Sequence, residues 1–595
     1  MMRAKKQRKV TVSNQKTREA LNHANSYAWR ANPGAYVGLM LLTILNGTSV
    51  YVSLSFTEYV VNAAHHLVIG NTSFHKTAIT VVLYSLILLL FSGLAVVEKN
   101  LKNRLTLDVN HLFRRELNEK LSHIGWEYYE SHETFSQIFE VRQHTNQAIL
   151  EFVDSIFSYV AVVPAVVVFG YYLLQINLLV IPVYILLVVV FNLVLAGNMF
   201  SQLQEYWKNV QPYAQKENYY FEMSGDKVSH QEFRFLRLFD FATSRWEECF
   251  NSEFNIKLKI FRKHEITLQT ARLLFNIPYI LMMIVIGIEV MHGRHEIGFL
   301  IMANGLLNQI IDTCLQVQNN ITRDHVNQRF FNTWVQVINY KEDPVDLPSA
   351  DFTDVEFRNI SYSYPQSRRK ALDGLTLSLK KGQKIAVVGL NGSGKTTFTN
   401  ILCNLVHEYS GSITDNSQSS FFHPCVSCVI QDFAQYQMTV RENIAAGNTA
   451  KDFSDAEIWS LLKQVGMDTF IESLPLGIQT PLGQLDSGIE LSKGQWQRIA
   501  IARLLAKEDS DIWILDEPTA YLDPISEIKI YEMIYQLSGD RTVLFISHRL
   551  GFARRADNIL LFQDGRVAES GSHKELLNIN GQYARMYEAQ KKWYA

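Results

Sequence analysis

The chain has 595 residues, 47% of them hydrophobic, and a formal net charge of −2. That length is enough for two or more domains, and the near-neutral charge gives no sign of a nucleic-acid partner, so none is expected. The hydrophobic residues are concentrated in the first half, in stretches too long for an ordinary soluble domain.

The first half contains six apolar stretches of membrane-spanning length. A helix needs about 20 apolar residues to cross a bilayer core, and buried helices of soluble proteins rarely need so many. Residues 155–200 carry no charged side chain, so we expect two spans there with a reversal at 175–177. The alternative, six core helices of a soluble protein, fits these uncharged stretches poorly. The expected spans are approximately 35–61, 77–97, 152–174, 178–200, 268–291 and 297–317.

Basic residues predict the orientation of these spans. Five Lys and Arg residues lie within the first nine positions, and the long segments 98–150 and 201–266 are rich in both. The other gaps between spans carry only Lys76 and Arg294. By the positive-inside rule, both termini and both long segments are expected in the cytoplasm. The first span is not preceded by a cleavable signal pattern.

Each long cytoplasmic segment is expected to form a helical hairpin. Arms of about 25 residues would reach about 35–40 Å beyond the membrane. The tips are predicted near residues 126–135 (WEYYESHETF) and 232–241 (EFRFLRLFDF). Both tips mix aromatic and charged residues, which suits docking against another domain, with solvated hairpins as the alternative.

The composition changes at residues 340–352, where charges and two prolines indicate a linker. Beyond it, strand-like and helix-like segments alternate to the end. We therefore predict an all-α membrane domain over 1–339 and an α/β nucleotide-binding domain over 353–595.

Residues 389–396, GLNGSGKT, fit the phosphate-loop pattern G-x-x-x-x-G-K-[ST]. They follow an apolar strand and open a helix, where backbone N–H groups and the helix dipole favour phosphate. Lys395 is expected to reach the β- and γ-phosphates, and Thr396 to bind Mg²⁺. The other residues assigned to the nucleotide here are Gly389, Asn391, Gly392, Ser393, Gly394 and Thr397.

A second candidate site lies in DIWILDEPT, residues 511–519. The run of apolar residues predicts a buried strand, whose end lies at the edge where α/β sheets bind ligands. Asp516 is expected to hold Mg²⁺, directly or through water, and Glu517 to polarise an attacking water. A solvated acidic loop is the alternative.

With these motifs in this order, the chain resembles the ABC transporters. Tyr364 in SYSYP matches the aromatic residue that stacks on adenine, and Gln431 in VIQDF matches the glutamine that senses Mg²⁺ and the attacking water. LSKGQ, residues 491–495, matches the signature motif. Asp523 in AYLDP and His548 in FISHRL match the D-loop aspartate and the switch histidine.

The resemblance implies an exporter that is half of a dimer, because only one ATPase domain is present. In the family, ATP lies between one phosphate loop and the partner's signature, here Ser492, Gly494 and Gln495. The implied ligands are ATP and Mg²⁺, and the implied catalytic residues are Glu517, His548 and Gln431. We expect a homodimer, with a heterodimer as the alternative.

Lys493 replaces the first glycine of the signature. Ser492 should cap the following helix, and a cation at that end opposes the helix dipole by about 0.3–1 kcal/mol. A triphosphate arriving from the partner would reverse this effect, so Lys493 could strengthen ATP-dependent closure. The alternative is a solvated side chain pointing away from the nucleotide.

The sixth span carries Asn304, Asn308, Asp312 and Gln316 at i, i+4 spacing. Polar groups at membrane depth usually face a cavity or another helix. We expect the first three to line a substrate cavity. Two alternatives explain the stripe as well. The polar residues form hydrogen bonds between helices, or the inner end of the span already lies in the cytoplasm.

The expected substrate follows from a closer resemblance. GQWQ, the first tip and VIQDFAQYQMTVRENI resemble lantibiotic and other bacteriocin-peptide exporters. About 34 residues precede the first span, too few for the leader-cutting protease domain of some such exporters. A multidrug or lipid exporter and an ATP-gated membrane regulator are the alternatives. The resemblance implies a bacterial plasma membrane.

The five cysteines are scattered, and only Cys425 and Cys428, near His423, form a CxxC. No second ligand pair follows at zinc spacing. The segment predicts a strand, in which residues three apart face opposite sides, so we interpret these cysteines as small packing residues.

Overall fold

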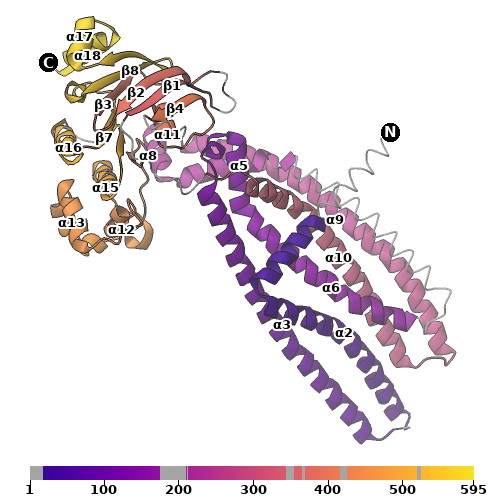
Figure 1. Cartoon of the computed structure of the whole chain (residues 1–595). Coiled ribbons are helices and arrows are strands. Elements are labelled where there is room, and N and C mark those ends of the chain that lie inside the picture. Colours follow the sequence, from indigo (N-terminus) through magenta and orange to yellow (C-terminus); the bar gives the residue numbers. More distant parts are fainter. Residues whose placement is uncertain are drawn as a thin grey trace. The chain divides into compact units, whose positions relative to one another are not determined.

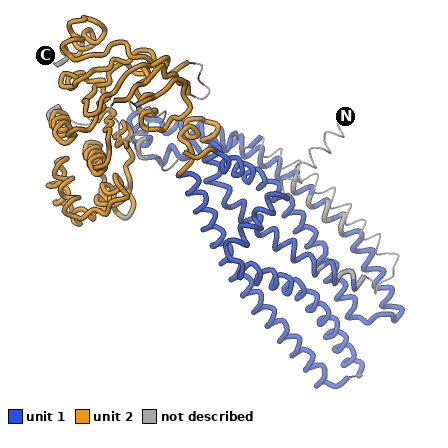
Figure 2. The backbone as a smooth tube through the Cα atoms, viewed as in Figure 1, with its two compact units in different colours: residues 1–122, 136–340 blue, residues 123–135, 341–595 orange. Residues whose placement is uncertain are grey.

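The computed structural model describes residues 18–70, 72–173, 209–210, 212–343, 354–364, 367, 369–415, 425–518 and 524–594. The chain forms two compact units, drawn in different colours in Figure 2. Unit 1 comprises Met1–Ser122 and Ser136–Tyr340, and unit 2 comprises His123–Phe135 and Lys341–Ala595. The predicted fourth span, the reversal at 175–177, His423 and Asp523 lie outside the described residues.

Unit 1 consists of long helices, as the apolar stretches predict (Figure 1). Within the described residues, four helices are long and apolar enough to cross a membrane: Pro33–Val68, Phe74–His123, His132–Val168 and Ile297–Ile338. A shorter apolar stretch, Asn276–Met291, ends α9. The helices described in this half of the chain are α2 (Pro33–Val68), α3 (Phe74–His123), α4 (Glu127–Glu130), which lies in unit 2, α5 (His132–Glu140), α6 (Asn146–Leu173), α8 (Lys227–Leu236), α9 (Phe239–Met291) and α10 (Ile297–Ile338), with a π-helical turn at Val141–Thr145.

Helix α3 is much longer than a membrane span. Its 50 residues extend about 75 Å, against about 30 Å for a bilayer core. The apolar part exposes Leu86, Leu89 and Leu90, as expected for a surface that faces lipid. The chain then reverses over residues 123–135, and a second time at Arg237, whose φ of 55° ends α8. Both reversals fall where the hairpin tips were predicted.

Helix α10 joins the apolar core of unit 1. Phe299, Met302 and Leu306 pack with Tyr51 of α2 and Met282 of α9. The approach of α2 to α10 is so close that a Cβ on Gly298 would lie 2.3 Å from the carbonyl oxygen of Glu58. Any larger residue at position 298 would therefore push these two helices apart.

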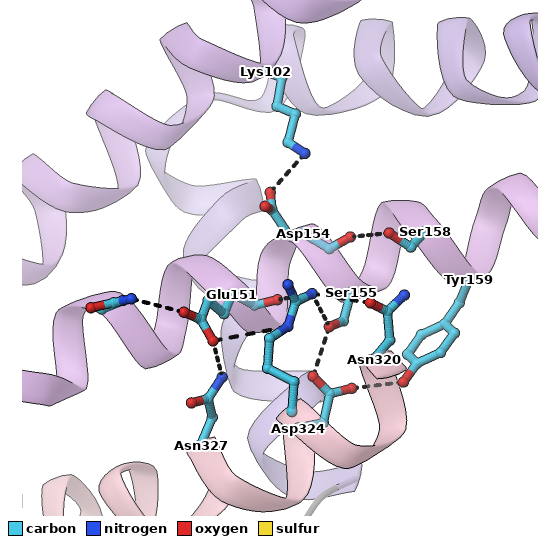
Figure 3. Close-up of polar contacts among 11 residues, drawn as sticks. Lys102, Glu151, Asp154, Ser155, Ser158, Tyr159, Asn320, Asp324 and Asn327 are labelled. Atoms are coloured by element: carbon cyan, nitrogen blue, oxygen red, sulfur yellow. Dashed lines mark hydrogen bonds and ion pairs between the residues drawn. The ribbon is translucent and has the colours of Figure 1, made fainter. Parts of the chain in front are cut away.

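A polar network around the buried Asp324 joins α6 to α10 (Figure 3). The Asp324 carboxylate is 1% exposed and accepts hydrogen bonds from Ser155 Oγ and Tyr159 OH, both at 2.7 Å. Arg323 donates to Ser155 Oγ at 3.0 Å, and Asn327 donates to Glu151 at 2.8 Å. We call these six residues the α6–α10 polar network. Buried carboxylates are tolerated only when they are paired in this way.

Unit 2 contains two sheets. The smaller sheet is antiparallel, with strand order β2-β1-β4. The larger has the order β5-β6-β7-β3-β8-β9 and is parallel apart from β9. The strands are β1 (Asp354–Tyr362), β2 (Leu372–Lys380), β3 (Lys384–Gly389), β4 (Ser410–Asp415), β5 (Val426–Val429), β6 (Ile512–Asp516), β7 (Thr542–Ile546), β8 (Asn558–Gln563) and β9 (Arg566–Gly571).

Helices and the small sheet cover the two faces of the large sheet. Alternate residues of its strands point to opposite faces, so Ala386 and Val388 enter one core and Ile385 and Val387 the other. Burial on both faces explains the uninterrupted apolar runs that were visible in the sequence. The helices of this unit are α11 (Lys395–Leu402), α12 (Val440–Ala445), α13 (Asp455–Gln464), α14 (Asp468–Glu472), α15 (Lys493–Ala506), α16 (Pro524–Leu537), α17 (His573–Ile579) and α18 (Gln582–Tyr594), with short 3₁₀ turns at Gly477–Gln479, Leu485–Ser487 and Phe552–Arg555.

Candidate ATP site

The phosphate loop connects β3 to α11, as predicted. Gly392 and Gly394 have φ angles of 75° and 104°, in the left-handed region that turns successive N–H groups toward a bound anion. A Cβ on Gly394 would lie 2.7 Å from the carbonyl oxygen of Ala371, so the close packing also requires glycine there. A Cβ on Gly392 would meet no atom within 4 Å, because this residue borders open space.

Lys395 is held in place by the loop that it follows. Its Nζ donates to the carbonyl oxygens of Gly389 at 2.9 Å and Leu390 at 3.0 Å, and burial lowers the pKa of this ammonium. Within the described residues, the buried Ser393 Oγ has no hydrogen-bond partner. A buried cation, an unpaired hydroxyl and inward N–H groups together fit a polyphosphate. Asn391 and Thr396 are exposed at the same loop, so Thr396 is accessible to a metal ion.

Asp516 ends β6 and Glu517 follows it, at the edge of the sheet where the phosphate loop begins. Burial, with the neighbouring Glu517 carboxylate, raises the pKa of Asp516 to about 6. A bound divalent cation would favour the ionised form of such a carboxylate. Glu517 has a φ of 48°, which is rare for a residue other than glycine and often found at functional sites.

The three predicted catalytic residues meet at the Glu517 carboxylate. Gln431 Nε2 donates to one carboxylate oxygen at 3.2 Å, and His548 Nε2 lies 3.0 Å from the other. These residues follow three different strands, β5, β6 and β7, whose carboxyl ends share one edge of the sheet. A carboxylate between an amide and an imidazole is suited to orient a water molecule and remove its proton.

One further residue at this site was missed from the sequence. Gln497 of α15 is 1% exposed, and its Nε2 donates to the backbone oxygen of Glu517 at 3.3 Å. It thereby ties the signature helix to the backbone of the proposed base. Gln497 is the last residue of the GQWQ segment, which supported a family resemblance in the sequence and was not used to assign a site residue.

Tyr364 lies against the phosphate-loop helix. Its hydroxyl is 3.0 Å from Thr397 Oγ1, and Thr397 is buried in α11. The tyrosine expected to stack on adenine and the threonine expected to face the phosphates therefore lie side by side.

The signature forms a complete helix cap, as predicted for Ser492. Gln495 N donates to Ser492 Oγ at 3.3 Å, and Ser492 N donates to Gln495 Oε1 at 2.8 Å. This capping box explains why the segment tolerates Lys493, the first residue of α15, in place of glycine. Lys493 is exposed, and Gly494 is half-buried beside it.

The tuning hypothesis for Lys493 gives a measurable expectation. Replacing Lys493 with glycine is expected to weaken the salt dependence of ATP binding and turnover, because the charge near the signature is removed. Both quantities are to be measured across a salt series. Lys493→Gln is the control that removes the charge without adding backbone freedom. Unchanged affinity and turnover at every salt concentration would leave only the solvated-side-chain interpretation.

Only some side chains of the polar stripe of α10 are exposed and so able to line a cavity. Asn304 accepts a hydrogen bond from Tyr279 of α9, and Asn308 donates back to Asn304 at 3.0 and 3.1 Å. Asn304 therefore joins two helices, which was the alternative interpretation of the stripe. Asn308, Asp312 and Gln316 are exposed.

Cys428 lies in β5 and packs with Cys403 against the core shared with the small sheet. Cys425 precedes the strand and is half-buried. Both agree with their interpretation as small packing residues.

A family model described as ABC transporter matches residues 372–520. The chain is 37% identical over 262 residues to the nisin transport ATP-binding protein NisT of Lactococcus lactis subsp. lactis, which is 43% of this chain and 44% of that protein. It is also 37% identical over 242 residues to the ATP-dependent lipid A-core flippase of Methylobacillus flagellatus, 40% of this chain and 41% of that protein. The chain matches less than half the length of these curated relatives.

Among solved structures, a bacterial Atm1-family ABC exporter with ATP bound has a similar fold. The TM-score is 0.78 at 21% identity, over 93% of this chain and 98% of that one. The likeness covers both units and establishes the fold, a helical domain followed by an α/β domain.

Proposed function

We infer that this chain, which belongs to the ABC transporters and has the exporter half-transporter layout, moves a substrate out of the cell by hydrolysing ATP. One observation carries this proposal: Gln431 and His548 both contact Glu517, at the sheet edge where the phosphate loop begins. The same chain carries several helices long enough to cross a membrane.

The proposed roles follow the chemistry of the side chains. Lys395 and the N–H groups of the phosphate loop bind the phosphates of ATP, and Tyr364 stacks on its base. Thr396, Asp516 and Gln431 would hold Mg²⁺, which supplies charge neutralisation to the transferred phosphoryl group. Glu517 accepts a proton from the attacking water, and His548 orients the terminal phosphate.

A second chain is needed to complete the site in this proposal. In the family arrangement the signature residues Ser492 and Gly494 contact the ATP held by the partner's phosphate loop. We propose a homodimer, since one chain supplies both halves of the sandwich. The D-loop residue Asp523 would lie at the same interface. ATP binding closes the two ATPase domains, and hydrolysis resets them.

The proposed substrate is a modified peptide of the lantibiotic or bacteriocin class. The relative named for nisin transport and the resemblance of the first tip support this choice. The relative named as a lipid A-core flippase supports a lipid as the second candidate. A regulator that moves no substrate fits less well, because Glu517 and His548 are both retained and a gate does not require hydrolysis.

ATPase stimulation separates the two substrate classes. In proteoliposomes, a lanthionine-containing precursor peptide is expected to raise ATP turnover severalfold, whereas lipid A core is not. The reverse pattern would reassign the chain to lipid export. No stimulation by either class would contradict both assignments.

The proposed location is a bacterial plasma membrane, crossed several times, with both termini in the cytoplasm. The distribution of Lys and Arg supports this orientation. It places the ATPase domain where ATP is available.

Asp312 offers a test of the proposed substrate path. Asp312→Ala is expected to change substrate-stimulated ATP turnover while basal turnover stays the same, because its carboxylate is exposed, whereas Asn304 is bonded to Tyr279 of α9. Asn319→Ala, another exposed position of α10, is the control. Equal loss of basal and stimulated turnover in Asp312→Ala would point to a structural role.

A further inference from the structure

The tip of the first hairpin, residues 123–135, is part of the ATPase unit, coloured accordingly in Figure 2. Backbone hydrogen bonds attach it to residues 341–343, where the chain returns to unit 2. Asp343 N donates to the oxygen of His123 at 2.8 Å, and Gly125 N donates to the oxygen of Lys341 at 3.3 Å. The Tyr128 hydroxyl of the tip also accepts a hydrogen bond from Lys341 N at 3.2 Å.

Glu130, the last residue of α4, connects the tip to β1. One carboxylate oxygen accepts from Trp126 Nε1 at 3.0 Å within the tip. The other accepts from the hydroxyl of Tyr362 at 3.3 Å. Tyr362 is 9% exposed, and burial together with the Glu130 carboxylate raises the pKa of its hydroxyl, which therefore stays protonated and remains a donor.

Tyr362 is in turn in contact with the tyrosine assigned to adenine. The rings of Tyr362 and Tyr364 are 5.2 Å apart at 78°, an edge-to-face pair. The hydroxyl of Tyr364 lies 3.0 Å from Thr397 Oγ1 of the phosphate-loop helix. A continuous series of contacts therefore runs from Glu130 through two tyrosines to the phosphate loop, entirely within unit 2.

We propose that Glu130 is a positioning residue for the nucleotide base, holding Tyr362 so that the ring of Tyr364 is presented to adenine. This inference rests on the proposed function and adds a role for a residue that lies between two helices of the membrane domain. Holding an aromatic ring in its binding orientation strengthens binding because less conformational freedom is lost on association. By thermodynamic reciprocity, a nucleotide base on Tyr364 then favours the docked tip.

The experiment compares ligands with and without a base on the full-length chain in lipid nanodiscs. Glu130→Ala and Tyr362→Phe are each expected to weaken ATP binding about 3- to 10-fold, the effect of losing one typical hydrogen bond. Binding of tripolyphosphate, which has no base, should not change. Glu130→Gln keeps an acceptor oxygen and should recover most of the affinity.

A matched control and a double variant test whether Glu130 acts through Tyr362. Glu133→Gln changes the charge of an exposed carboxylate on the same tip and should leave ATP binding unchanged. Glu130→Ala combined with Tyr362→Phe should be no weaker than either alone, because both remove one interaction. Additive losses, equal losses for ATP and tripolyphosphate, or unchanged ATP affinity would each overturn the proposal.

Two measurements keep this test separate from folding and from the proposed function. An unchanged unfolding midpoint for Glu130→Ala, or for the milder change Tyr362→Phe, shows that the variant is folded, and its ATP affinity then decides the positioning role. If the wild-type chain hydrolyses ATP while Glu130→Ala binds it normally, only the positioning role fails. A wild-type chain that binds ATP but never hydrolyses it would overturn the proposed function instead.

Discussion

Replacing Glu517 with glutamine is expected to lower ATP turnover by about 10²- to 10⁴-fold, the usual contribution of a general base. ATP binding should persist, because the phosphate loop and Tyr364 are untouched and glutamine fills the same space. The amide can still meet His548 and Gln431, which contact the carboxylate at 3.0 and 3.2 Å. Phosphate release and equilibrium ATP binding, measured on the same preparation, check both halves of this expectation.

The control for this variant is Glu472→Gln. Glu472 is an exposed carboxylate on α14 of the same unit, so its change of charge should leave turnover as it is. Near-normal turnover in Glu517→Gln would show that another group accepts the proton. Loss of ATP binding in that variant would instead show that the carboxylate is needed for the nucleotide site itself.

Replacing Asp324 with alanine is expected to destabilise unit 1 by about 1–3 kcal/mol, the cost of leaving a buried hydrogen-bonding group without its partner. The substitution removes the acceptor of two hydroxyls, that of fully buried Ser155 and that of half-buried Tyr159. The Ser155 hydroxyl would then be buried with one partner fewer. The unfolding midpoint and the monodisperse yield in detergent measure the effect.

Two variants of α10 make the comparison specific. Asp324→Asn keeps an acceptor oxygen for one of the two hydroxyls, so its loss of stability should be smaller. Asp312→Ala removes an exposed carboxylate from the same helix and should leave the midpoint unchanged. Equal midpoints for Asp324→Ala and Asp312→Ala would contradict the structural role of the α6–α10 polar network.

The ATP site could be predicted from the sequence because each of its parts is local. The phosphate loop is a strand, a turn and a helix within a few residues, and its glycines adopt the expected left-handed angles. The capping box of Ser492 and Gln495 spans four residues. That Gln431, Glu517 and His548 meet at one carboxylate follows from their positions after parallel strands.

The contacts that the sequence did not predict join residues far apart in the chain. Glu130 and Tyr362 are separated by 232 positions, and Ser155 and Asp324 by 169. No periodicity within one segment specifies which other segment it will contact. The sequence predicted that the tip is suited to dock against another domain. The structure shows which residue it contacts, because Tyr362 donates a hydrogen bond to Glu130 of the tip.

The polar stripe of α10 illustrates the same limit. Residues spaced by four in a helix advance by about 40° each time, since each residue turns about 100°. The stripe therefore moves around the helix, from exposed Asp312 and Gln316 to buried Asn320 and Asp324. Its first part was interpreted as cavity lining, whereas its continuation packs against α6. The spacing predicted the stripe but not the change in its surroundings.

Uptake into inside-out membrane vesicles tests the central claim, export driven by ATP hydrolysis, most directly. We predict that vesicles with the wild-type chain accumulate a lanthionine-containing precursor peptide only when ATP and Mg²⁺ are present. Vesicles with Glu517→Gln should bind ATP and accumulate none. Accumulation that continues without ATP, or is equal in Glu517→Gln, would contradict the account.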